Sequence, residues 1–169
     1  GSAHFLSACG KNILVDYGME QGVNVFENAE LPVSPSEIDY LLVTHAHVDH
    51  TGMIPALYKN GFKGEIYATS ATCELCDIML RDSAHIQEFE AEWKNRKNKR
   101  AGKEHFEPAY TMEDVEGVLS HFHKVSYNED LTLCEGIIIS FTDVGHLLGS
   151  ASIKIIITED NVTKTIVFS

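Results

Sequence analysis

The 169-residue sequence predicts one α/β domain in which helices and strands form a layered sandwich. Strand-like apolar runs occupy both ends of the chain, and helix-like segments lie between them. No internal repeat or linker divides the sequence. The composition, 44% hydrophobic and 22% charged residues, is that of a globular protein with a real core. These observations favour an α/β sandwich over an all-β fold.

The first part of the chain is expected to contain short strands separated by loops. In chain order we predict a hairpin over residues 3–16 with its turn at 9–11, a loop over 18–35, a buried strand at 40–44, a short helix at 52–59 and a strand at 65–68. Asn60-Gly61 closes the helix, because glycine is favoured just after a helix C-terminus.

The middle of the chain is expected to be helical and the last third to be strands. A long helix is predicted from an apolar stripe with helical spacing: Leu75, Met79, Ile86, Phe89 and Trp93. We expect it to fade before Gly102. A capping pattern at Thr111–Asp114 opens a second helix. Four strands are predicted at 131–134, 137–142, 152–157 and 163–168, the last two joined by a turn at 159–161.

The four cysteines do not indicate a disulfide framework. Cys73 and Cys76 have the C-x-x-C spacing of zinc and redox sites, but they lie in a segment with helical periodicity, so we expect them to pack on a helix. Reduced thiols and the absence of an export signal suggest the cytoplasm. No apolar run reaches 18 residues, so no membrane span is expected.

The charge of the chain is unevenly distributed. A net charge of −12 argues against a protein that coats nucleic acid nonspecifically. Six of the 13 basic residues nevertheless fall in one stretch: Lys94, Arg96, Lys97, Lys99, Arg100 and Lys103. Such a run is most often a solvated helix end, and a contact with RNA is the alternative.

The chemistry is concentrated in a cluster directly after the buried strand. His45, His47, Asp49 and His50 place four potential metal ligands in six residues. This is not the H-E-x-x-H spacing of a helical zinc site. His45 and His47 leave a strand end and can converge on one point, while Asp49 and His50 can face a second point nearby. A surface loop that happens to contain histidines would not account for the preceding strand and the following Gly52.

A zinc ion needs about four ligands, so the loop requires a ligand from elsewhere. Among the remaining histidines we favour His146, which lies in a glycine-flanked loop directly after a predicted strand. His121 and His123 would share one face of an extended segment, a pattern more typical of packing or solvent exposure. The other candidates are His4, His85 and His105.

These motifs resemble those of metallo-β-lactamase-fold hydrolases. The cluster at 45–50 resembles the signature H-x-H-x-D-H of that superfamily, and Asp16 resembles its early structural aspartate. The segment 143–151, Asp-Val-Gly-His-Leu-Leu-Gly-Ser-Ala, is similar to the third motif of the β-CASP RNA-processing nucleases, which include ribonuclease J. The segment 79–88 resembles the bacterial RNA specificity factor hydrolases. The resemblance covers nearly the whole chain and implies a metallo-β-lactamase αβ/βα sandwich.

The resemblance also implies roles for individual residues. One zinc ion would be bound by His45, His47 and His146, and a second by Asp49 and His50. The two metals would activate a water that attacks phosphorus in line, with Asp49 and His146 as the catalytic residues. Asp16 would hold the histidine loop in position. Ser150 would either donate a hydrogen bond into the site or cap a local element.

The sequence ends at Ser169, where the family continues into Gly-Asp with an aspartate that bridges both metals. We therefore expect residues 1–169 to be the N-terminal part of a metallo-β-lactamase domain, without the β-CASP insertion and the C-terminal part. We expect its second metal site to be incomplete and the isolated chain to be nearly inactive. RNA is the favoured substrate. The alternatives are a small ester or thioester hydrolase of the glyoxalase or lactonase type and a non-catalytic scaffold. The sequence leaves open whether the full-length protein forms a homodimer.

Overall fold

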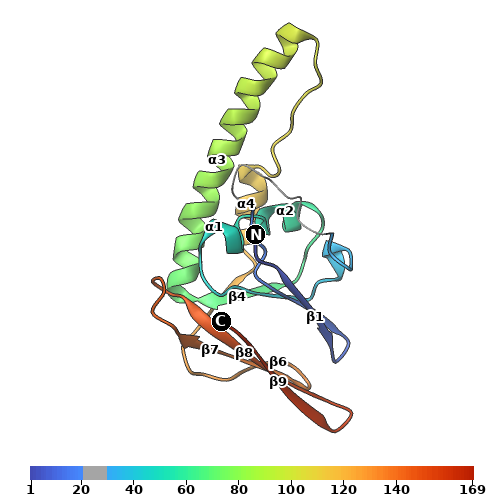
Figure 1. The fold of residues 1–169 in the computed structure, drawn as a ribbon, viewed down its shortest axis with the longest axis vertical. Helices are drawn as coiled ribbons and strands as arrows, with labels where there is room; N and C mark the ends of the chain where they lie inside the picture. The colour runs from blue at the N-terminus through green and yellow to red at the C-terminus, as the bar shows by residue number, and fades with distance from the viewer. Residues whose placement is uncertain (21–29) are drawn as a thin grey trace.

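The computed structural model describes residues 1–20 and 30–169 and consists of three layers. Two β-sheets pack face to face, and helices cover the outer face of the first sheet (Figure 1). The predicted α/β sandwich is therefore confirmed. Part of the loop predicted at 18–35 lies outside the described residues. No helix in the described part of the chain has the length and apolar character needed to cross a membrane.

The first sheet has five strands in chain order and positions the histidine cluster. Its strands are β1 (His4–Ala8), β2 (Lys11–Val15), β3 (Tyr40–Leu42), β4 (Glu65–Thr69) and β5 (Phe122–Val125). The β1–β2 hairpin is antiparallel, as predicted, and the other neighbours pair in parallel. Parallel neighbours need long crossovers, and helical segments provide them between β3 and β4 and between β4 and β5. β5 is not among the predicted strands, although an extended segment was considered for His121 and His123.

The second sheet is an antiparallel meander that confirms the four predicted C-terminal strands. It contains β6 (Leu131–Cys134), β7 (Ile137–Asp143), β8 (Ala151–Glu159) and β9 (Val162–Phe168). Alternate residues of β8 are buried, which is the period of a strand with one face on the core. Asp160 and Asn161 have positive φ angles in the β8–β9 turn, as tight hairpin turns require.

The helices differ from the predictions at their boundaries. They are α1 (Val48–Thr51), α2 (Ile54–Lys59), α3 (Ser70–Ala101) and α4 (Met112–Leu119), with a short 3-10 helix at Pro35–Glu37. The helix expected at 52–59 is α2, which begins two residues later than expected, and the unpredicted helix α1 precedes it and contains Asp49 and His50. The capping prediction for α4 is confirmed, because the Thr111 backbone N–H donates to Asp114 Oδ2 at 2.9 Å.

The long helix α3 is confirmed. It ends at Ala101, within the basic stretch and before Gly102, as expected, and Gly102 has a φ of +66°. The apolar stripe that predicted the helix does not face the core along its whole length, because Ile86, Phe89 and Trp93 are 49%, 66% and 52% exposed. The face that packs on the core carries another set of residues: Thr72, Cys73, Cys76, Leu80, Ala84 and Ala91.

The core has one layer between the sheets and one beneath the helices. Between the sheets, Val15 and Leu42 of the first sheet pack against a group from the second: Ile137, Ile139, Phe141, Ile153 and Ile155. On the other face, Leu41 and Val43 pack against Ile54 and Leu57. The strand β3 is thus buried on both faces, as its continuous apolar run predicted. Cys73 and Cys76 are buried free thiols on α3, which confirms the packing interpretation.

Candidate metal centre

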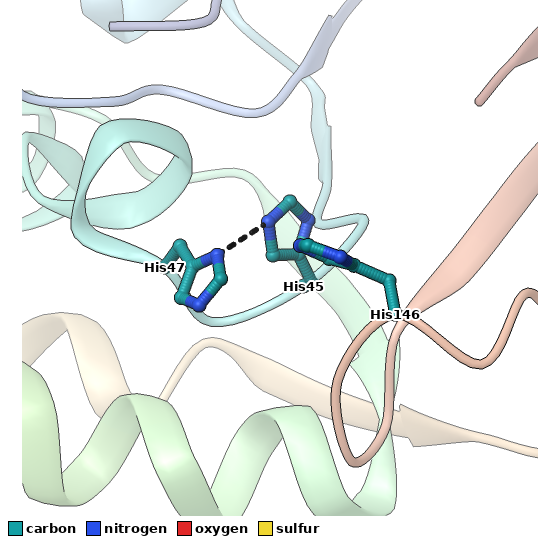
Figure 2. Close-up of side chains that lie close together, drawn as sticks. All are labelled: His45, His47 and His146. Carbon is teal, nitrogen blue, oxygen red and sulfur yellow. Dashed lines mark hydrogen bonds between the residues drawn. The ribbon is translucent and has the colours of Figure 1, made fainter.

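Three histidines from two separate loops converge at the edge between the sheets. His45 and His47 lie on the loop after β3, and His146 lies on the loop between β7 and β8, facing them (Figure 2). One nitrogen of each imidazole lies within 4.8 Å of one nitrogen of each of the other two. The ring centroids of His45 and His146 are 4.9 Å apart. The expectation that these three side chains share one point is therefore confirmed.

Hydrogen bonds determine which nitrogen of His45 faces this point. The Thr44 hydroxyl lies 2.7 Å from Asp16 Oδ2 and 3.0 Å from His45 Nδ1. Since an ionised carboxylate can only accept, Thr44 donates to Asp16 and accepts from the Nδ1–H of His45. His45 Nε2 is then left with a lone pair directed at His47 Nδ1, 3.1 Å away.

The electrostatic surroundings keep His45 uncharged. The side chain is 8% exposed. Burial, followed by the neighbouring His50, lowers the pKa of His45 to about 4. An imidazole that stays neutral at physiological pH retains the lone pair that a metal ion requires.

Asp16 organises both halves of the cluster from beneath. Its side chain is buried, and its carboxylate accepts from the Thr44 backbone N–H at 2.8 Å, the Thr44 hydroxyl and His50 Nδ1 at 2.8 Å. Its φ is +58°, an uncommon backbone conformation that directs the carboxylate beneath the loop. The hydrogen bond from His50 to Asp16 is the largest of the effects that raise the pKa of His50.

Asp49 and His50 define a second point next to the first. His50 Nδ1 is engaged by Asp16, so its Nε2 faces outward, 3.7 Å from Asp49 Oδ2. The rings of His45 and His50 lie 4.1 Å apart, which places the two points side by side. Both residues lie in α1 rather than in an irregular loop, and this regular backbone fixes their relative directions.

The loop that carries His146 is held from both sides. The hydroxyls of Thr69 and Thr72, at the start of α3, donate to the Gly149 carbonyl at 2.6 and 2.9 Å. The Ala151 backbone N–H donates to the Thr44 carbonyl at 2.8 Å, which ties this loop to the end of β3. Ser150 is 1% exposed, and its hydroxyl accepts from the Leu147 backbone N–H at 3.0 Å. This contact matches the local capping role considered for Ser150.

A cavity of roughly 520 Å³ opens over these residues. Its walls include Asp16, His45, His50 and His146, and its rim is formed by the chain termini at Ser2 and Phe168. His4, one of the other histidines considered above, also lines it. The cavity is therefore large enough for part of a substrate to lie against the histidine cluster.

The donor set fits a zinc ion. Two nitrogens bound to one tetrahedral zinc at about 2.1 Å lie roughly 3.4 Å apart. The 3.1 Å between His45 Nε2 and His47 Nδ1 is close to this separation, and His146 approaches from a third direction. The neutral state of His45 and the carboxylate beneath it agree with the usual carboxylate–histidine–metal arrangement.

Other predicted residues lie outside the cluster. His121 Nδ1 donates to the Gly64 carbonyl at 2.8 Å and its ring packs against Tyr58 and Phe62. His123 stacks on Tyr67 and is 48% exposed, so both histidines agree with the packing or solvent exposure expected of them. Five of the six basic residues lie in the last turns of α3, at the end of the helix far from the sheets, and Lys103 follows that end (Figure 1). Thr44, Thr69 and Thr72 were not predicted to support the site, since threonine in a strand or at a helix start is ordinary.

Comparisons with known proteins agree with the fold and the motifs. Residues 5–168 match a protein family described as "Metallo-beta-lactamase superfamily domain". Ribonuclease TTHA0252 of Thermus thermophilus is 38% identical over 152 residues, which cover 89% of this chain and 31% of the relative. Transcription termination factor FttA of Methanococcus maripaludis is 31% identical over 149 residues, covering 88% and 21%. The RNase J-like protein of Methanocaldococcus jannaschii is 32% identical over 142 residues, covering 83% and 27%.

Solved structures show the same fold at low sequence identity. A subclass B3 metallo-β-lactamase with an active-site glutamic acid has a TM-score of 0.58 at 18% identity, covering 98% of this chain and 54% of that one. MEM-A1, a subclass B3 enzyme from a soil metagenome library, has a TM-score of 0.57 at 16% identity, covering 99% and 55%. The chain thus spans about a third or less of the curated relatives named above and about half of these structures.

Proposed function

Because its family match covers residues 5–168, the chain belongs to the metallo-β-lactamase superfamily, and we propose that it forms the metal-binding part of an RNA nuclease. The observation that carries this proposal is the convergence of His45, His47 and His146, with Asp49 and His50 beside them. Relatives named ribonuclease, RNase J-like protein and transcription termination factor support RNA as the substrate class. The motif at 143–151 supports the β-CASP branch.

The proposed site holds zinc through five side chains. His45, His47 and His146 would bind one ion, and Asp49 and His50 the other. When bound, two zinc ions lower the pKa of a water molecule and neutralise charge that develops on phosphate oxygens. RNA is a polyanion with one charged phosphodiester per nucleotide, so such charge neutralisation favours RNA over an uncharged substrate.

The side chains of the protein would position the attacking water, accept its proton and hold the metal ligands in place. The Asp49 carboxylate, 55% exposed, lies at the open side of the cluster, where it can orient the attacking water and accept its proton. His45 is neutral, so its Nε2 can bind a metal ion without first losing a proton. Asp16 touches no substrate; it is a positioning residue that fixes the ring orientations of His50 and, through Thr44, of His45.

Two other functions use the same fold. A small ester or thioester hydrolase would need the same metals, and the β-lactamase neighbours show only the fold, because they are below 25% identity. The relatives above 30% identity carry names of RNA-directed proteins, which favours the nuclease. A non-catalytic scaffold would not need all five donor side chains, so the complete set disfavours it.

The decisive experiment compares wild-type full-length protein with Asp49→Asn and His146→Ala on single-stranded RNA. We expect metal-dependent cleavage that a chelator abolishes and that each substitution lowers by at least about 100-fold. His121→Ala is the matched control, because it removes a packing histidine and should leave cleavage nearly unchanged. Full-length protein that ignores RNA but rapidly hydrolyses a thioester or lactone would assign the site to the alternative.

The 169-residue chain by itself is expected to be a partial enzyme. In the described residues the second point has two donors, Asp49 and His50, and zinc commonly requires about four ligands. We therefore expect the isolated chain to retain one zinc ion tightly and to cleave RNA far more slowly than the full-length protein. Four free cysteines and an RNA substrate are consistent with a reducing compartment such as the cytoplasm.

A further inference from the structure

A row of large apolar side chains lies exposed on the outward face of α3. Ile78, Ile86, Phe89 and Trp93 are 67%, 49%, 66% and 52% exposed. At about 100° per residue their spacing confines them to an arc of roughly 80° on one side of the helix. We call these four side chains the outward stripe. The C-terminal part of α3 extends beyond the rest of the domain (Figure 1). Large apolar side chains exposed together on one face of a helix are typical of an interaction site.

The charged residues of α3 change sign along the helix. Up to Trp93 the helix carries six acidic residues and one cation, Arg81, whereas its last turns carry only cations. The acidic residues are Glu74, Asp77, Asp82, Glu88, Glu90 and Glu92, and the later cations are Lys94, Arg96, Lys97, Lys99 and Arg100. Some of these charges are already paired, since Arg81 contacts Asp77 and Glu116, and Arg96 contacts Glu92. Lys99 and Arg100 form no ion pair with any described residue. The helix therefore presents an acidic part that contains the outward stripe and a basic end with cations that form no ion pair.

We propose that a second copy of this chain covers the outward stripe, with the two α3 helices antiparallel about a twofold axis. In that arrangement the outward stripes meet, and the basic end of each helix lies beside the acidic part of the other. A parallel arrangement would place like charges together. In a twofold interface the same surface of both copies meets, so that surface must complement itself. A helix that is acidic in one part and basic at the other end does so when the two copies are antiparallel.

RNA is the other partner that the basic end suggests, and the charge pattern disfavours it. A helix of 32 residues is about 48 Å long, and its start lies next to the His146 loop. An RNA strand that ran from the histidines to the basic end would have to pass the acidic part of α3. Phosphates would be repelled there, in a chain whose net charge is already −12.

The first test measures self-association by sedimentation equilibrium of the full-length protein. We expect a reversible dimer whose dissociation constant rises by at least about 100-fold in the double variant Phe89→Glu/Trp93→Glu, because large aromatic residues dominate interfaces. Val162→Glu is the control: Val162 is 54% exposed on β9, outside the outward stripe, and its substitution should leave the dimer intact. Circular dichroism of each variant checks that the fold is retained.

The second test uses charge reversal to distinguish a second copy of the chain from RNA as the partner of this surface. Arg100→Glu and Glu74→Arg should each weaken the dimer about tenfold, since every contact occurs twice, and the double variant should recover most of the loss. A protein that is monomeric at all concentrations overturns the proposal, as does a dimer that is unaffected by the stripe variant. Arg100→Glu that abolishes binding of single-stranded RNA in a monomeric protein would assign the surface to RNA instead.

Discussion

At the scale of single residues, the most consequential group is a carboxylate that faces no substrate. Asp16 accepts three hydrogen bonds, two from Thr44 and one from His50. Through the Thr44 hydroxyl it also fixes the tautomer of His45. One buried side chain therefore sets ring orientations at both proposed metal positions.

Replacing Asp16 by asparagine is expected to weaken zinc binding about 10- to 100-fold while the fold persists. Asparagine preserves the shape and tolerates the positive φ, but its neutral amide offers one acceptor oxygen to three donors. Competition titration with a chromophoric chelator measures the affinity. Asp39→Asn is the control, because Asp39 pairs with Lys11 and the Asn12 backbone away from the histidines. Equal loss in both variants would show that the effect is general destabilisation.

The sequence predicted the candidate metal ligands better than it predicted the residues that hold these ligands and their loops in place by hydrogen bonds. Histidine and aspartate at this spacing, after a buried strand, are unusual enough to be recognised in the chain itself. Thr44 and Thr72 bear no such mark, because their importance arises only when two distant loops meet. Supporting residues of this kind can be identified only from three-dimensional contacts.

At the scale of elements, the loop between β7 and β8 controls where His146 lies. Two of its glycines have positive φ, +67° at Gly145 and +84° at Gly149. They differ in surroundings. A Cβ added at Gly145 would meet nothing within 4 Å, whereas one at Gly149 would lie 2.6 Å from the Thr72 backbone nitrogen.

Alanine at these two positions should therefore have different consequences. Gly145→Ala is expected to cost about 1–2 kcal/mol of folding free energy, from the backbone conformation alone. Gly149→Ala should cost more and should also weaken zinc binding, because the start of α3 and the His146 loop must separate. Urea unfolding and zinc titration of both variants measure the two effects. Equal zinc affinity in the two variants would contradict the role assigned to this close approach.

Helix α3 shows where periodicity stops being informative. Its apolar residues predicted a helix correctly, yet the face that packs on the domain uses alanine, cysteine and threonine. Small residues allow helices to approach closely but give little signal in a hydropathy pattern. The bulkiest residues, Phe89 and Trp93, lie on the opposite side. Periodicity identifies an amphipathic helix but not the partner of its apolar face.

At the scale of the whole molecule, the layers followed from the sequence more readily than the sheet order. Strand-like apolar runs predicted the C-terminal meander, and its four strands form the second sheet. The fifth strand of the first sheet was missed because residues 122–125 are half polar and none of them is buried. Only parallel pairing with β4, about 55 residues earlier in the chain, defines them as a strand.

The positions of the three histidines determine when the metal site forms during folding. His45 and His47 follow the first sheet and His146 belongs to the second, about 100 residues later, so the site closes only when both sheets have docked. The zinc site therefore forms late in folding, after the folding transition state. At 1,000 times its dissociation constant, zinc should slow unfolding by about 1,000-fold and leave the refolding rate nearly unchanged. Stopped-flow kinetics in denaturant measures both rates; refolding that accelerates with zinc would show that the histidines meet before the sheets dock.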